Sequence, residues 1–242
     1  MNAIFKNLQT DGLAAAEDRL GGYSVLPTGY YEATIKMAYA GQSTSGAHNV
    51  TLIADIDGRE YRETIYVTNK QGENFFLDQN DKTKKIALPG FRTVDDICLL
   101  TVATSLSEME SEEKVVKVYD AGEGKEVPKA VQAFTALIGQ KVGLAIVHQI
   151  EDKTKKEGTQ YVPTGESRDV NVIEKAFHAA MGLTTVEIRN GDKEPAFKDA
   201  WIAKHKDKPR DKRAKGNAGA PAARSGPPQA GGPKKNSLFA NV

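Results

Sequence analysis

Residues 29–68, GYYEATIKMAYAGQSTSGAHNVTLIADIDGREYRETIYVT, decide the fold class, because they hold three consecutive runs of alternating apolar and polar residues. Alternation with a period of two is typical of a strand with one buried and one solvated face. Asp57-Gly58, between the second and third runs, supplies the positive φ angles that a two-residue hairpin turn needs. The stretch therefore predicts an antiparallel three-stranded meander.

A two-residue turn also fixes which residues face each other. It places Ile56 opposite Arg59 and pairs Ala54 with Tyr61, but it sets Asp55 against Glu60. Like charges directly across a ladder repel each other, so a bulge or a slipped register is an alternative. In the first run the alternation predicts that one face carries Tyr31, Ala33, Ile35, Met37 and Tyr39.

The polar face of the predicted hairpin has two interpretations. An exposed sheet face with an arginine, a tyrosine and several hydroxyls can stack bases and contact phosphates. Antiparallel sheets also commonly leave one ordinary face in water, so the pattern alone does not choose between the two. The residues predicted on this face are Asn49, Thr51, Arg62, Thr64 and Tyr66.

Composition excludes several classes of protein. The chain has 242 residues and an apolar fraction of 39%, which is enough for the core of one large or two small domains. It lacks a run of about 20 apolar residues and a signal peptide, so we expect it to be neither membrane-bound nor secreted. The single cysteine, Cys98, has apolar neighbours, which predicts a buried thiol in a reducing compartment such as cytoplasm.

The net charge of +1 hides a strong asymmetry. Residues 201–242 carry ten Lys or Arg and two Asp, a balance of +8, whereas the rest has 23 basic and 30 acidic residues, a balance of −7. A basic tail on an acidic body can gather the phosphates of a polyanion, or it can fold back on its own body. The candidate electrostatic residues of the tail are Lys208, Arg210, Lys212, Arg213 and Lys215.

Domain organisation follows from the change in composition near the end. We expect residues 1–205 to form one domain with an N-terminal arm, and residues 206–242 to be a disordered tail rich in Gly, Pro and Ala. The tail ends in a short apolar segment in which Leu238 and Phe239 are candidates for docking to a protein partner. The alternative is a terminus without a role.

Beyond the meander, the pattern predicts further strands and helices. Adjacent Phe75 and Phe76 on a short strand should point to opposite faces, one of them beside a cationic loop. The remaining predictions are helices beginning near 93 and spanning 128–138, 171–180 and 195–205, and strands at 114–119, 141–150 and 184–189.

Motifs for catalysis are missing. The four histidines are scattered, without ligand spacing, and we find no dinucleotide-binding fingerprint and no nucleophile elbow. We therefore expect a protein that is not an enzyme and that needs neither a metal nor another cofactor.

Several stretches resemble a family of bacteriophage single-stranded DNA-binding proteins. They are IFKNLQTDGLAAAEDRLGGY, IKMAYAGQSTSGAHNVTLI, NFFLDQNDKTKKIALPGFRTVDDICLL, QYVPTGESRDVNVIEKAF and a final SLF. The resemblance implies an elaborated five-stranded OB-fold barrel, mainly β with added helices, that coats single-stranded DNA without sequence preference in phage replication, recombination and repair. It also implies action in the cytoplasm of the infected bacterial host, with phage or host replication and recombination proteins as partners.

The alternation, rather than the resemblance, selects the candidate DNA contacts. They are aromatic and basic residues on the predicted open face and on the cationic loop: Tyr30, Lys36, Tyr39, Arg59, Arg62, Tyr66, Phe75, Lys84 and Arg92. The family often ends in an acidic tail, whereas this tail is basic, so we predict that the tail adds affinity for DNA. The alternatives are a virion or replisome scaffold tethered to nucleic acid by its tail and, third, a DNA-processing enzyme.

Overall fold

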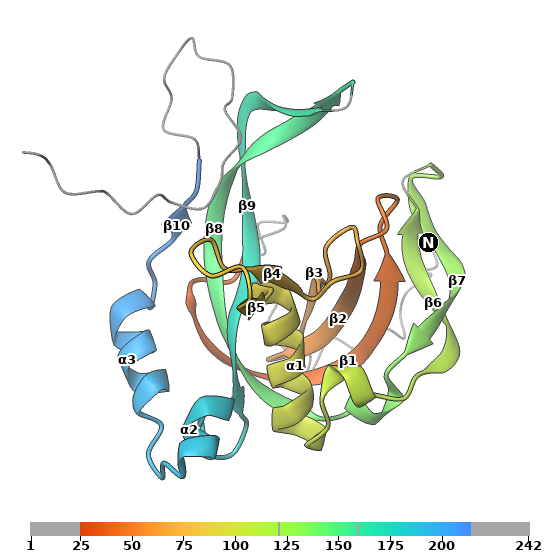
Figure 1. The fold of residues 1–242 in the computed structure, drawn as a ribbon. Coiled ribbons are helices and arrows are strands. Elements are labelled where there is room, and N and C mark those ends of the chain that lie inside the picture. Colours follow the sequence, from red (N-terminus) through yellow and green to blue (C-terminus); the bar gives the residue numbers. More distant parts are fainter. Residues whose placement is uncertain (1–24, 121, 159, 214–242) are drawn as a thin grey trace, which may run out of the picture.

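The computed structural model describes residues 25–120, 122–158 and 160–213, and within them the protein is mainly β with three α-helices (Figure 1). The prediction of a mainly β protein with added helices is confirmed. In chain order the elements are β1 (Gly29–Gln42), β2 (His48–Ile56), β3 (Arg59–Tyr66), β4 (Phe75–Leu77), β5 (Lys85–Ala87), α1 (Pro89–Val102), β6 (Glu112–Asp120), β7 (Lys125–Ala133), β8 (Lys141–Glu157), β9 (Gln160–His178), α2 (Thr185–Asn190), α3 (Ala196–His205) and β10 (Arg210–Asp211), with short 3₁₀ turns at Leu106–Glu108 and Thr135–Leu137.

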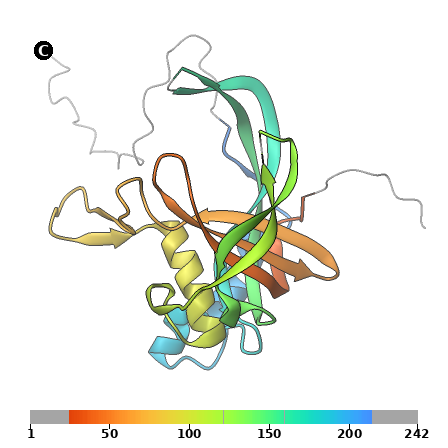
Figure 2. The same ribbon diagram turned by 90° about the vertical axis from the view of Figure 1, so that its right-hand side faces the viewer.

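Eight strands form one sheet, in which the order β10-β8-β1-β2-β3 is extended by β9 on β8 and by the β6–β7 hairpin on β1. β4 and β5 form a separate two-stranded sheet. The finer prediction, an elaborated five-stranded OB-fold barrel, is not confirmed, because the eight-stranded sheet of the described residues does not close into a barrel. Two long hairpins, β6–β7 and β8–β9, project away from the rest of the sheet (Figures 1 and 2).

The predicted hairpin is confirmed in every pair. Asp57 and Gly58 have φ angles of 51° and 79°, which makes the turn a tight two-residue one. Ile56 faces Arg59, and the ladder continues in register to the end of β3. Asp55 does stand opposite Glu60. The Asp55 carboxylate accepts the Gly58 N–H at 3.1 Å, and this local hydrogen bond offsets the repulsion between Asp55 and Glu60.

A β-bulge corrects the predicted face of the first strand. The register of β1 against β2 shifts between Ile35 and Met37, so Lys36 is an extra residue. A shift of one residue sends all later side chains to the opposite face. Ile35 therefore lies in the main core, whereas Tyr39 packs with Ile53 on the other side of the sheet.

Two predicted helices are wrong. Residues 128–138 form the end of β7 and a 3₁₀ turn, and residues 171–180 lie mostly in β9. Each of these segments is held in a sheet ladder, β7 by β6 and β1 and β9 by β8, and such pairing overrides local helix propensity. The Asn171 side chain donates to the Leu26 carbonyl and accepts the Leu26 N–H, each at 2.8 Å, so it is tied to a distant segment.

The predicted strand at 184–189 is also wrong, because this segment forms α2. Thr184 and Glu187 make a capping box in which the Glu187 N–H donates to the Thr184 hydroxyl at 3.2 Å and the Thr184 N–H donates to the Glu187 carboxylate at 2.8 Å. The other helices and strands are confirmed, although α1 begins four residues before Thr93, at Pro89. In α3, Trp201 is buried and Phe197 is 45% exposed.

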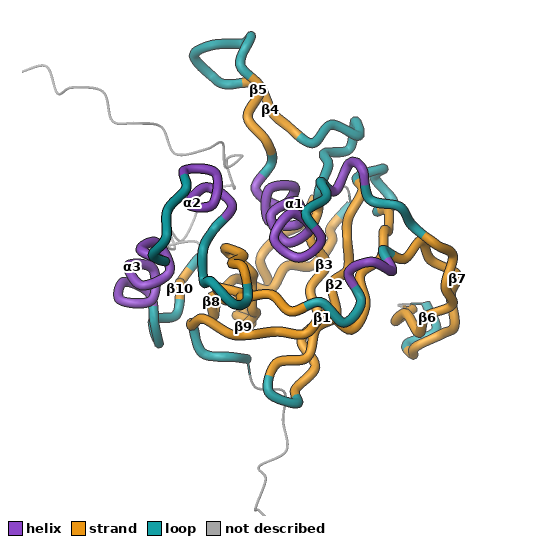
Figure 3. The backbone as a smooth tube through the Cα atoms, turned by 90° about the horizontal axis from the view of Figure 1, so that it is seen from below, coloured by secondary structure: helices purple, strands orange, loops and turns teal. Residues whose placement is uncertain are grey.

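The main core lies between the sheet and α1. Figure 3 shows α1 end-on against one side of the strands. Val94, Ile97 and Cys98 of α1 are buried against apolar residues of β1, β2, β3, β8 and β9. The predicted burial of Cys98 is confirmed. Because α1 covers this side, the opposite side of β1, β2 and β3 is the one that can receive a ligand.

Candidate nucleic-acid interface

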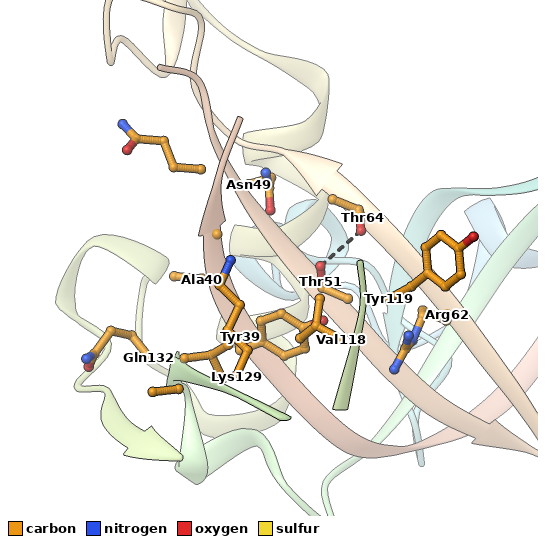
Figure 4. Close-up of a pocket in the computed structure, with 14 residues that line it drawn as sticks. Tyr39, Ala40, Asn49, Thr51, Arg62, Thr64, Val118, Tyr119, Lys129 and Gln132 are labelled. Carbon is orange, nitrogen blue, oxygen red and sulfur yellow. Dashed lines mark hydrogen bonds between the residues drawn. The ribbon is translucent and has the colours of Figure 1, made fainter. Parts of the chain in front are cut away.

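An open groove of about 620 Å³ lies between the β1–β2–β3 meander and the β6–β7 hairpin (Figure 4). The hairpin is attached to the meander because β7 pairs with β1 at Tyr39 with Ala133 and Ala40 with Gln132. The bulge at Lys36 is what turns Tyr39 toward this side of the sheet. The groove is thus formed by segments that are far apart in sequence.

The floor of the groove is polar and uncharged. The hydroxyls of Thr51 and Thr64, directly opposite each other on β2 and β3, are hydrogen bonded at 2.9 Å. Asn49 lies further along β2 toward its start, and a methyl group on Gly41 would stand only 2.7 Å from the Asn49 side-chain oxygen. Glycine at position 41 therefore leaves the space that the Asn49 amide occupies. Hydroxyl and amide groups can donate to and accept from base edges.

The sides of the groove carry aromatic rings and positive charge. Tyr119 of β6 is 60% exposed, and its ring lies beside Arg62 in Figure 4. The Arg62 guanidinium is 3.6 Å from the Glu126 carboxylate, so part of its charge is matched. Lys129 of β7 is exposed and also lines the groove. An exposed ring for stacking and cations for phosphates are the features of a single-strand site.

Three of the nine predicted contacts lie in or beside this groove. Arg62 lines it directly. Tyr66 is 53% exposed, and alternation along β3 puts it on the same face as Arg62, opposite Asn49 across the ladder. Tyr39 lines the groove too but is only 6% exposed, so it supports the floor and offers no free ring face.

Three others lie away from the groove. Tyr30 packs edge-on against Phe177, with ring centroids 5.6 Å apart, in the apolar cluster beneath α3. Lys36, at the bulge, is 4.0 Å from Asp55, and Arg59 is in the Asp57-Gly58 hairpin. The structure does not bring these side chains together with the groove residues.

None of the last three predicted contacts, Phe75, Lys84 and Arg92, lines the groove. Phe75 and Lys84 belong to the β4–β5 hairpin, and Arg92 is in the first turn of α1. Phe75 is half-buried, and the Lys85 ammonium group lies 4.2 Å from its ring centroid. One face of the Phe75 ring is therefore already occupied.

Tyr119 and Lys129 were missed from the sequence. Tyr119 ends the predicted strand at 114–119, where the alternation of KVVKVY was the available signal. Lys129 was hidden by the wrong helix at 128–138. Because β7 was not predicted, nothing in the sequence put Tyr119 or Lys129 opposite the meander.

Four of the tail candidates belong to the folded body. Arg210 pairs with Glu174, and the Arg213 guanidinium donates to Asp211 at 2.6 Å. The Lys208 ammonium group donates to a main-chain carbonyl at 2.9 Å, and the Lys212 N–H donates to the carbonyl of Ile150 at 2.8 Å. Figure 1 shows β10 on the opposite side of the molecule from the β6–β7 hairpin. Lys215, Leu238, Phe239 and the N-terminal arm lie outside the described residues.

The described residues hold little else that suggests chemistry. Burial raises the pKa of the Cys98 thiol to about 12, so it is a poor nucleophile at neutral pH. No three His, Cys, Asp or Glu side chains in residues 25–120, 122–158 and 160–213 are grouped to hold a metal ion. In the same part of the chain no helix has the length and apolar character needed to cross a membrane.

Comparisons with known proteins identify no family for this chain. No protein-family model matches the chain, and no curated protein sequence matches it. The resemblance to phage single-stranded DNA-binding proteins therefore remains a hypothesis from the sequence, and the groove is the independent observation that bears on it.

Proposed function

We propose that the protein binds single-stranded DNA without sequence preference, with the strand lying in the groove between the β1–β2–β3 meander and the β6–β7 hairpin. The observation that carries the proposal is one groove lined by the exposed ring of Tyr119 with Arg62 beside it, by Lys129, and by a floor of hydroxyl and amide groups. No catalytic step is part of the proposal.

The chemistry favours a single strand over a duplex. A base can stack on Tyr119 only if its own face is uncovered, and in a duplex neighbouring bases cover both faces. Every base has such a face, so stacking tolerates any sequence. Arg62 and Lys129 supply the charge for the phosphates. The groove thus suits a protein that coats and protects exposed strands.

The architecture supports an elaborated and opened OB fold. In OB folds, oligonucleotides bind across strands 2 and 3 and the loops beside them. Here the groove floor is made by β1, β2 and β3 and its side by the β6–β7 hairpin, and α1 comes between the meander and that hairpin in the sequence. On the sequence resemblance to phage single-stranded DNA-binding proteins, the proposal extends to a role in phage DNA replication, recombination and repair, in the cytoplasm of the infected host.

Binding of the full chain to labelled oligothymidylate and to a duplex of equal length tests the proposal. Anisotropy titrations at several salt concentrations should show tighter binding of the single strand throughout. Equal affinity for the two forms would contradict it, and degradation of the DNA would favour an enzyme.

A further inference from the structure

A second, smaller concavity of about 280 Å³ lies between the β4–β5 hairpin, α1 and β9. Its apolar side is made by Phe76, Ile86 and Pro89, and Arg92 lines it from the first turn of α1. Its volume is close to the lower limit for small-ligand sites, about 300 Å³. It therefore has room for one flat group such as a nucleobase.

Phe76, and not Phe75, presents its ring on this hairpin. Phe76 is 45% exposed and lines the concavity, whereas Phe75 is half-buried with the Lys85 ammonium group over its ring. The two side chains point to opposite faces because they are adjacent on one strand. Only Phe76 thus offers a stacking surface in the concavity.

Among the described residues that line the concavity, one cation is not paired with a carboxylate. The Asp96 carboxylate is 2.8 Å from the Lys175 ammonium group and also accepts the Thr185 hydroxyl at 2.6 Å. Glu174 is engaged by Arg210 and by the Trp201 indole N–H, the latter at 2.8 Å.

Within the part of the chain that the structure describes, Arg92 has no comparable ion pair and is exposed. The concavity therefore suits an anion, because Asp96 and Glu174 are already paired with cations whereas no carboxylate of the described residues pairs with Arg92.

Tyr66 connects the concavity with the groove. Its side chain is on the groove face of β3 and is 53% exposed. Its carbonyl lies so close to Gly90 of α1 that a methyl group there would stand 2.1 Å from the carbonyl oxygen. Arg92 follows two residues later. A DNA strand that leaves the groove at Tyr66 has only to cross the edge of β3 to reach Arg92.

We propose, building on the proposed function of the groove, that the bound strand continues past Tyr66 over the edge of β3. One base then stacks on Phe76 in the concavity and its phosphate pairs with Arg92. This second contact lengthens the binding site beyond the groove, so it contributes only to strands long enough to reach it.

A length series of oligothymidylates, from about 4 to about 16 nucleotides, tests the proposal on the full chain, since OB-type sites cover about that range. The variants are Phe76→Ala and Arg92→Ala. The matched controls are Phe197→Ala, a phenylalanine of the same 45% exposure on α3, and Arg189→Ala, an exposed arginine on α2. All are surface substitutions, so thermal unfolding should show little change.

Both variants should bind the shortest strands as the unaltered protein does and lose about tenfold in affinity for the longest, as expected for one lost base stack. The controls should match the unaltered protein at every length. Equal affinity of Phe76→Ala and the unaltered protein at all lengths would overturn the second contact while leaving the groove intact. An equal loss at every length would also overturn it, because the contact would then belong to the primary site. No binding of any single strand by the unaltered protein would defeat the proposed function itself.

Discussion

The Glu63 carboxylate of β3 accepts the main-chain N–H of Ile173 of β9 at 2.9 Å, although β3 and β9 are not paired as strands. The same oxygen accepts the Tyr61 hydroxyl at 2.6 Å. A side chain thus connects the two strands where a closed barrel would have a ladder. Residues of α1 pack in the same core cluster as Ile65 of β3 and Ile173 of β9, so the contact lies beside that core.

The Glu63 contact predicts a pH-dependent effect of Glu63→Gln on stability. Burial raises the pKa of Glu63 above its usual 4.5, with the hydrogen bonds from Tyr61 and Ile173 opposing the shift in part. Glu63 contributes its full stabilisation at pH values below its pKa in the unfolded chain. This stabilisation is lost as pH rises through the higher pKa that Glu63 has in the folded protein. Glutamine keeps an oxygen for the Ile173 N–H and cannot ionise.

Chemical denaturation near pH 4 and near pH 8 measures this effect. The free energy of unfolding of Glu63→Gln relative to the unaltered protein should improve as pH rises, by about 1.4 kcal/mol per unit of raised pKa. Glu63→Ala, which leaves the Ile173 N–H without its acceptor, should cost about 1–3 kcal/mol. A difference between Glu63→Gln and the unaltered protein that does not change with pH would contradict the account.

The single tryptophan should be insensitive to a ligand in the groove. Trp201 is 6% exposed and packs with Phe177 beneath α3, so no base can stack on its ring. Titration with an oligothymidylate of about 4 nucleotides should leave its fluorescence emission unchanged while anisotropy reports binding. Strong quenching at saturation would place the strand at α3 instead.

Removal of the tail should lower affinity without removing the preference for single strands. The shortened chain should end at Arg213. A chain that ended at residue 200, where the basic composition begins, would lose half of α3 together with the buried Trp201. Residues 214–242 carry four basic and no acidic residues. The slope of log affinity against log salt should fall by at most about 3, at roughly 0.7 per phosphate contact for single strands.

Anisotropy titrations of the chain ending at Arg213, across salt concentrations, measure that slope. If this shortened chain bound single strands and duplexes equally, the tail would be the DNA-binding element. The protein would then fit the alternative of a scaffold tethered to nucleic acid.

The sequence predicted the hairpin of the meander correctly because its determinants are local. Asp57-Gly58 dictates a two-residue turn, and such a turn fixes the register of both strands. The bulge at Lys36 has no comparable signal, since nothing in Ile35-Lys36-Met37 differs from ordinary alternation. Its effect was large, because it put Tyr39 on the side of the sheet opposite to Ile35, with which the alternation had grouped it.

The groove itself could be predicted only in part. Its floor on β2 and β3 followed from alternation, but its side required β7, which local propensity had assigned to a helix. β7 pairs with β6 in a hairpin and with β1 over a long sequence distance, and the 3.6-residue spacing in PKAVQAFTALI obscured both pairings. Lys129 was lost with that strand, and Tyr119 was left without a partner surface.

The affinity of Tyr119→Ala for a single strand tests the central claim most directly. Tyr161→Ala is the matched control, because Tyr161 is a tyrosine of β9 that is 70% exposed and lies outside the groove. The account predicts a loss of about 1–3 kcal/mol for Tyr119→Ala, as for one base stack, and none for Tyr161→Ala, with both proteins folded. Equal affinity of the two variants for oligothymidylate would contradict binding in the groove.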